Sequence, residues 1–262
     1  MKNIAKSQLY QLRKSKLPYA IFFVILFLQL FTIATTVINN LDGPDITGSS
    51  FVAEQGAALF MTPIFFLSII TGIVTGADFM DKTTNYEIMT GHTRAEVYFG
   101  RVIPALVVSV AGGFILAIIP VLAANFIFGW GTKMSLSGVI IRYILVIFPY
   151  FRLACEFVFL TFVVRNSYMI MAMGFVYYML GSILADGGKR ASSVLLGLTN
   201  LNVLGNFGSF STYNVLDGAT VITVYDSNVG VSTVVSTIAA SLLIGSFFLL
   251  IGYVFFKNDD LS

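Results

Sequence analysis

Six long runs of apolar residues most constrain how this chain can fold. A helix needs about 20 mainly apolar residues to cross the hydrocarbon core of a membrane. The runs that meet this length span residues 17–38, 56–77, 102–124, 139–164, 168–185 and 229–256. Only 11% of the residues are charged, whereas a soluble domain carries about 25%. The sequence therefore predicts an all-α integral membrane protein with six transmembrane helices, in a single domain that covers residues 1–262.

Lysine and arginine are unequally divided between the two sets of loops. One set, which includes both chain ends, holds ten of them: Lys2, Lys6, Arg13, Lys14, Lys16, Lys82, Arg94, Arg101, Arg165 and Lys257. The other set holds only Lys133, Lys189 and Arg190. Loops rich in these residues stay in the cytoplasm, so both termini are expected there. The net charge of +2 gives no support to a nucleic-acid partner.

Two segments outside the apolar runs have a recognisable character. Residues 1–16 are basic and carry Ile4, Ala5, Leu9 and Leu12 on one side of a helix, as expected for a helix in the headgroup plane. They are either a positively charged flank with no further role or an elbow that orients the first span. The outer segment 186–228 has apolar stretches too short to cross and many Gly and Asn residues, which predicts re-entrant helices.

The polar segment 78–101 is predicted to form a helical hairpin between the second and third spans. Residues 81–89 are long enough for two helical turns, with Asp81 or Thr83 as N-cap. Gly91 is placed to end that helix. Thr93 and Glu96 have the spacing of a capping box that starts a second helix, which continues into the third span. Such an element either transmits force from a soluble partner or simply closes the hairpin.

This segment resembles the permease subunits of the ATP-binding-cassette type-two exporter family. The resemblance is closest to the branch of bacteriocin, lantibiotic and peptide-toxin export or immunity permeases. The matching elements are Asp78-Phe79, Lys82-Thr83-Thr84-Asn85, Gly91-His92-Thr93-Arg94 and Tyr98-Phe99-Gly100-Arg101. The six-span layout with a long outer segment extends the resemblance over nearly the whole chain. The chain departs from the family at Thr83, where Gly is frequent, and at His92, where Pro is frequent.

The resemblance implies a transport function in a bacterial plasma membrane, in which ATP is used by other subunits. The stretch 81–89 would be the coupling helix that docks on an ATP-binding-cassette ATPase. The residues implied in this coupling are Asp81, Thr84, Tyr86, Glu87, Ile88, Met89 and Arg94. A second permease copy or a paralogue would complete the path, and the substrate would be an amphipathic peptide, lantibiotic, toxin or drug. The family would thereby link the chain to antimicrobial resistance.

The chain has no expected catalytic, metal or nucleotide site of its own. Its only Gly-Lys pair, Gly188-Lys189, lacks the P-loop context that cradles phosphate, so ATP and magnesium would be bound by the partner ATPase. A single His, His92, and a single Cys cannot supply a metal cage or a zinc-protease motif. The alternative to a transporter is a membrane channel or scaffold that works without an ATPase.

Two features of the spans themselves are candidates for interactions inside the membrane. Arg152 and Glu156 lie four residues apart in the fourth span. They are predicted to pair, because an isolated charge at that depth costs roughly 2.5–3.5 kcal/mol on insertion scales. The pair is either structural or part of a substrate path or dimer interface. Gly72 and Gly76 permit close helix approach, within the subunit or between two copies.

Overall fold

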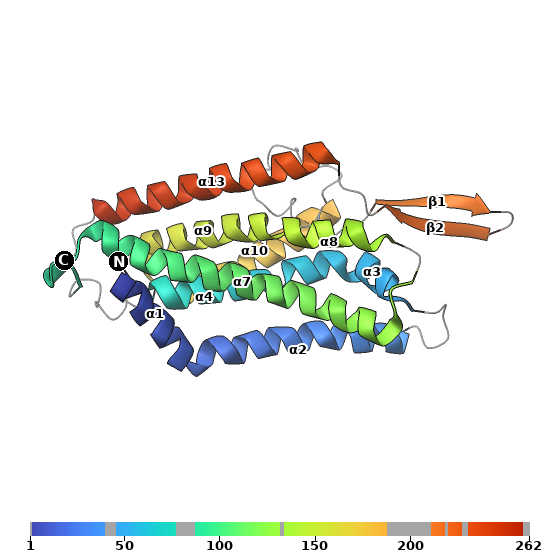
Figure 1. Ribbon diagram of the computed structural model, residues 1–262, viewed down its shortest axis with the longest axis horizontal. Coiled ribbons are helices and arrows are strands. Elements are labelled where there is room, and N and C mark those ends of the chain that lie inside the picture. The colour runs from blue at the N-terminus through green and yellow to red at the C-terminus, as the bar shows by residue number, and fades with distance from the viewer. Residues whose placement is uncertain are drawn as a thin grey trace.

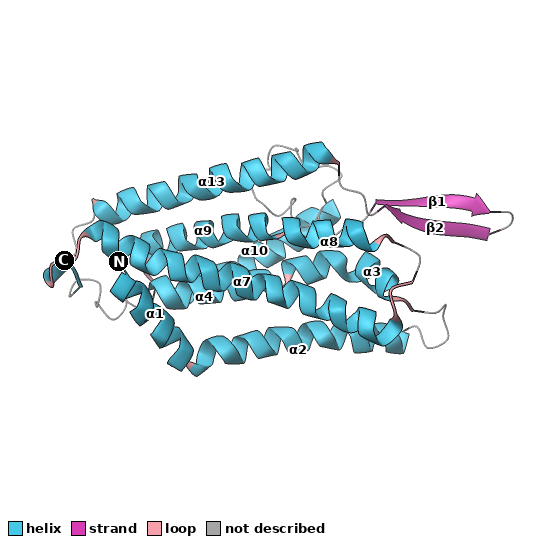
Figure 2. Cartoon of the chain, viewed as in Figure 1, coloured by secondary structure: helices cyan, strands magenta, loops and turns pink. Residues whose placement is uncertain are grey.

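The computed structural model describes residues 2–39, 46–76, 87–131, 134–187, 211–217, 220–226 and 230–258. The elements are α1 (Lys2–Lys14), α2 (Lys16–Asn39), α3 (Gly48–Met61), α4 (Pro63–Thr71), the π-helix η1 (Gly72–Gly76), α7 (Arg94–Phe128), α8 (Leu136–Leu145), α9 (Ile147–Val164), α10 (Ser167–Gly187), β1 (Ser211–Asp217), β2 (Thr220–Asp226) and α13 (Val231–Lys257). The secondary structure is predominantly helical, as expected (Figure 2).

Five stretches within the described ranges are long and apolar enough to cross a membrane. They are Lys16–Ile38, Ala58–Gly76, Arg94–Phe128, Leu136–Val164 and Val234–Lys257. The run expected to form another span lies in α10, whose apolar part is the shorter Ser167–Leu180. These helices make the chain a multi-pass α-helical membrane protein.

The long helices lie side by side, with α2 and α13 on opposite sides of the bundle (Figure 1). In the most apolar stretch of each span, 72% of the residues are buried for Ala58–Gly76 and 67% for Leu136–Val164. The shares fall to 22% for α2 and 17% for α13. The core is therefore formed around α4, α7 and α9, and the outer faces of α2 and α13 are left to lipid or a partner.

The two ends of the bundle differ in what they carry. The start of α1 and the end of α13 lie at one end, and the β1–β2 hairpin projects from the other (Figure 1). At the hairpin's end of the bundle, the Gly48 and Ser49 amides at the start of α3 donate to the carbonyls of Gly129 and Trp130, at 2.7 and 2.9 Å. These bonds use helix amides that have no partner within α3.

The β-hairpin corrects one prediction. Residues 211–217 and 220–226 pair as antiparallel strands, with Asp217 opposite Thr220, so residues 211–226 form no re-entrant helix. The second strand reads Thr-Val-Ile-Thr-Val-Tyr, and β-branched and aromatic residues favour strands. Only two residues separate the strands in the sequence, a length typical of a hairpin. Residues 188–210, 218–219 and 227–228 of the expected outer segment lie outside the described residues.

The second predicted span is broken at Thr62 and Pro63. Because proline has no N–H, it cannot donate to the carbonyl of Leu59 four residues earlier. Gln29 of α2 donates to that carbonyl through Nε2 at 3.4 Å. The Tyr150 hydroxyl of α9 donates to the neighbouring carbonyl, that of Phe60, at 2.8 Å. Helices on both sides of the break thus supply hydrogen bonds to its carbonyls.

The fourth predicted span is also two helices, α8 and α9, which meet at Val146. Pro149 follows three residues later. Because it has no N–H, it cannot donate the helical hydrogen bond to the carbonyl of Leu145. The two breaks contact one another, because Tyr150 binds Phe60 and the rings of Phe60 and Tyr143 lie 4.6 Å apart. The two predicted spans are each found as one apolar stretch, Ala58–Gly76 and Leu136–Val164. Proline alone did not predict the breaks, because α7 stays continuous through Pro104 and Pro120.

The Gly72 and Gly76 pair packs within the subunit. A Cβ at Gly72 would lie 3.1 Å from the Ser167 carbonyl oxygen, and one at Gly76 would lie 3.1 Å from the Ser167 Cα. The Ser167 hydroxyl donates to the Gly72 carbonyl at 2.7 Å. Of the two roles open to this motif, the described structure shows close packing of η1 against the start of α10.

Two buried tyrosines give a matched test of the proline break. Tyr150→Phe removes the hydroxyl that binds Phe60 and should lower the free energy of unfolding in detergent by about 1 kcal/mol. Tyr143→Phe is the control, because within the described part of the chain its hydroxyl has no hydrogen-bond partner. Its loss should be neutral or slightly stabilising. Equal destabilisation by both variants in denaturant titrations would contradict the role given to Tyr150.

Candidate functional site

The predicted coupling segment is described from Glu87 onward. Asp81, Thr84 and Tyr86, and with them most of the expected 81–89 helix, lie outside the described residues. Residues 87–89 are helical, and this turn ends as predicted at Gly91, which has a φ of 96°. The Gly91 amide donates to the Ile88 carbonyl at 3.1 Å and the His92 amide to the Glu87 carbonyl at 3.4 Å. This pair of bonds is a Schellman motif.

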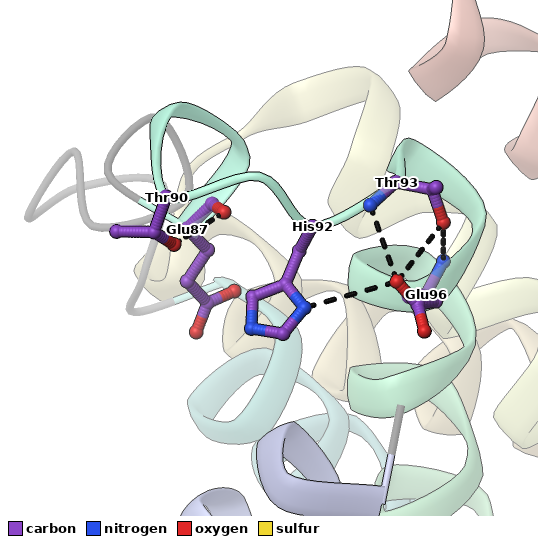
Figure 3. A network of polar contacts seen from close by, with 5 residues as sticks. All are labelled: Glu87, Thr90, His92, Thr93 and Glu96. Atoms are coloured by element: carbon purple, nitrogen blue, oxygen red, sulfur yellow. Dashed lines mark hydrogen bonds and ion pairs between the residues drawn. The ribbon is translucent and has the colours of Figure 1, made fainter.

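A capping box starts α7 directly after this turn, as predicted. The Thr93 hydroxyl accepts from the Glu96 amide, and the Glu96 carboxylate accepts from the Thr93 amide, both at 3.3 Å. His92 lies between the side chains of Glu87 and Glu96 (Figure 3), with its Nδ1 3.7 Å from Glu96 Oε2. Residues 87–96 therefore form a compact turn and helix start in which successive backbone groups are hydrogen-bonded.

Glu87 pairs with Arg101, which lies two turns along α7. Arg101 Nη2 donates to Glu87 Oε2 at 2.9 Å, and the Arg101 side chain is only 1% exposed. The Thr90 hydroxyl donates to the Glu87 carbonyl at 2.8 Å (Figure 3). The sequence left open whether Glu87 acts across an interface or within the hairpin. In the structure its carboxylate binds within the hairpin.

Arg94 fixes the start of α7 to the end of α13. Its Nη1 donates to the carbonyls of Lys257 at 2.6 Å and Phe256 at 3.4 Å. A cation at this place also complements the negative end of the α13 dipole. One turn further, the Tyr98 hydroxyl donates to the Leu249 carbonyl of α13 at 2.8 Å. Arg94, like Glu87, therefore acts within the chain.

Sequence reasoning missed the roles of Tyr98 and Arg101. Arg94, Tyr98 and Arg101 recur at intervals of four and three residues, which places them on one face of α7. That face packs on the 87–91 turn and on α13. The spacing was the available signal, although nothing in it identifies Glu87 as the partner of Arg101.

The two apolar side chains of the 87–91 turn face different ways. Ile88 is half-buried and packs against the hydrophobic core, so it belongs to the chain's own interior. Met89 is 80% exposed. Of the coupling residues described, Met89 is therefore the apolar side chain available to a partner.

Arg152 and Glu156 lie together inside the bundle. Arg152 Nε donates to Glu156 Oε1 at 3.2 Å, and the two residues are 1% and 5% exposed. The Tyr177 hydroxyl of α10 donates to Glu156 Oε2 at 3.4 Å. A Cβ at Gly245 of α13 would lie 3.5 Å from the Arg152 Cα. The pair thus connects α9 and α10 where α13 packs closely, an arrangement that favours its structural role.

No metal centre is seen among the described residues, where no group of three or more His, Cys, Asp or Glu side chains is placed to hold an ion. Cys155, next to Glu156, is a buried free cysteine.

The buried pair predicts an asymmetric mutational effect. Arg152→Met leaves Glu156 buried without its cation and should lower the free energy of unfolding by about 3 kcal/mol. The double change Arg152→Met with Glu156→Leu should recover most of that loss, as measured by denaturant titration in detergent. Lys6→Gln, at an exposed position of α1, should change stability by less than about 0.5 kcal/mol. A double variant no more stable than Arg152→Met would rule out the pairing explanation.

The sequence was also compared with known proteins. No model of a known protein family matches the chain, and no curated protein matches it either. The functional conclusion therefore rests on the residues, their geometry and the resemblance in the 78–101 segment.

Proposed function

We propose that this chain is the permease subunit of an ATP-driven exporter of the ATP-binding-cassette type-two class. It would lie in a bacterial plasma membrane with six spans and both termini in the cytoplasm. Separate ATPase subunits would bind ATP and magnesium, and a second permease copy or a paralogue would complete the path. The substrate would be amphipathic: a peptide, lantibiotic, toxin or drug.

The rigid anchoring of the 87–91 turn is the observation that carries this proposal. A segment that transmits a displacement from a soluble partner must be held rigidly against the membrane helices, because a flexible segment would move without moving the helices. The turn is joined to α7 by the buried Arg101–Glu87 pair. The start of α7 is joined in turn to α13 by Arg94 and Tyr98. Displacement of the turn would therefore be passed to two long helices together.

An array of aromatic rings reinforces the same end of the bundle. Tyr98 of α7 lies 4.7 Å from Phe162 of α9 and 5.9 Å from Phe256 of α13, measured between ring centroids. Phe162 and Phe256 lie 5.4 Å apart. Aromatic pairs at these distances each contribute about 0.5–1.5 kcal/mol beyond the area that they bury. The ends of three spans next to the 87–91 turn would thus move as one body.

The six-span layout is supported by α10 and by the arrangement of the ends. The 21 residues of α10 correspond to about 31 Å of helix, enough for the hydrocarbon core. With α10 added to the five spans, the count is even, and the start of α1 and the end of α13 lie at the same end (Figure 1). The distribution of Lys and Arg assigns that end to the cytoplasm.

Photo-crosslinking at Met89 tests the proposal. The photoreactive residue benzoylphenylalanine at Met89 should cross-link to a P-loop ATPase in intact cells. The same residue at Phe126, which is 91% exposed at the other end of α7, is the matched control and should not. If Met89 is an interface anchor, Met89→Ser should weaken the binding free energy of that ATPase by about 2 kcal/mol, which would be seen as reduced co-purification. The substitution does not alter the Glu87–Arg101 pair.

Cross-linking to no ATPase, with a folded and inserted permease, would overturn the assignment. It would favour the channel or scaffold alternative, which requires no ATPase at this turn.

A further inference from the structure

Two apolar grooves of similar size open on different sides of the described bundle. One, of about 530 Å³, has an entirely apolar lining: Ile103, Leu106, Val107, Val110, Ala111, Phe114, Ile147, Phe148, Phe151 and Leu242. The other, of about 500 Å³, is lined by Leu9, Leu12, Arg13, Pro18, Tyr19, Phe22, Phe23, Phe66, Ile70 and Val108. The second groove, named here the elbow groove, contains a cationic side chain, and the first does not.

The elbow groove is formed where α1 turns into α2. The two helices meet at Ser15, whose amide donates to the Gln11 carbonyl at 2.9 Å, and they diverge in a V (Figure 1). The buried residues Ile4, Gln8 and Leu12 fix one face of α1 toward the bundle. Residues of α2 form the facing wall, and Phe66 and Ile70 of α4 with Val108 of α7 form the floor.

The charge around the elbow groove is positive. Arg13 lines it, and its neighbours Lys14 and Lys16 are exposed. The Lys14 ammonium lies 5.0 Å from the centre of the Tyr10 ring. The first 41 residues of the chain contain no Asp or Glu. The groove therefore suits a ligand that has both an anionic group and a hydrocarbon chain. Its apolar residues can contact the chain, and the Arg13 guanidinium can bind a phosphate through paired hydrogen bonds.

The location of the groove identifies the occupant. A basic amphipathic helix lies at the level of the lipid headgroups, and the apolar lining comes from helices that cross the membrane. Leu9, Tyr19 and Phe23 at the groove are exposed, so the groove opens toward lipid. We infer that the elbow groove binds one anionic phospholipid, with its phosphate on Arg13 and an acyl chain against Phe22, Phe66 and Val108.

This inference is independent of the transport function. A lipid held in this way contacts α1, α2, α4 and α7 at once, so it stabilises the angle between α1 and α2. It also gives the basic N-terminal segment a role as an elbow, one of the two interpretations that the sequence left open.

Lipid titration followed by native mass spectrometry tests the inference. The full-length protein in detergent is titrated with phosphatidylglycerol or phosphatidylcholine, and bound lipid is counted. Arg13→Gln should weaken binding of one phosphatidylglycerol about fivefold, which corresponds to about 1 kcal/mol. It should weaken binding of phosphatidylcholine less, because the choline cation offsets the charge of the phosphate. Lys6→Gln is the matched control, because Lys6 is exposed on the same helix but does not line the groove. It should change neither.

A second pair of variants tests the acyl-chain site. Val108→Phe fills the elbow groove and should reduce binding of the preferred phosphatidylglycerol, whereas Val107→Phe projects into the other groove and should leave the preference intact. Equal losses from Arg13→Gln and Lys6→Gln would show general attraction to positive charge and overturn the inference. Unchanged binding in Val108→Phe would overturn it as well.

Discussion

The structure depends on one constraint: polar groups inside the bilayer must find partners within the protein, because lipid tails offer none. The break at Pro63 shows how this is met, since the carbonyls of Leu59 and Phe60 receive hydrogen bonds from α2 and α9. Arg152 meets it through Glu156 of the same helix, which is also bound by Tyr177 of α10. The bonds from Gln29, Tyr150 and Tyr177 each join two different helices, and that from Tyr150 to Phe60 joins helices far apart in the sequence. Polar satisfaction, together with apolar packing, therefore sets which helices are neighbours.

Helix α7 connects the features on which function would depend. Its 35 residues extend over roughly 50 Å, well beyond a hydrocarbon core of about 30 Å. One end carries the capping box and the ion pair to Glu87, and the opposite end is followed by carbonyls that bind the start of α3. Between these ends it contributes to the floor of the elbow groove through Val108. A displacement at the 87–91 turn would therefore be transmitted along α7 to the end of the bundle where α3 begins.

Local signals in the sequence were sufficient where the structure is local. Gly91 and the Thr93–Glu96 box needed only neighbouring residues, and both were predicted with their correct roles. Arg152 and Glu156 were predicted to pair because they are four residues apart on one helix. The partners of Arg101 and Leu59 depend on helix packing and were not predictable from spacing. The β-hairpin was missed because the short apolar stretch 221–224 was interpreted as part of a re-entrant helix, although consecutive β-branched residues favour a strand.

The arrangement around Pro63 also constrains how the sequence can change over time. Proline at this position creates an acceptor at Leu59 that Gln29, from a different helix, binds. A residue with an N–H at position 63 would restore the helical donor and leave the buried Gln29 amide competing for an acceptor already in use. A carbonyl oxygen can accept two hydrogen bonds, so a polar residue at position 29 would still be accommodated, but it stabilises the fold most while the proline remains. The two positions are thus expected to evolve as a linked pair, so that the order in which substitutions arise decides which of them can persist.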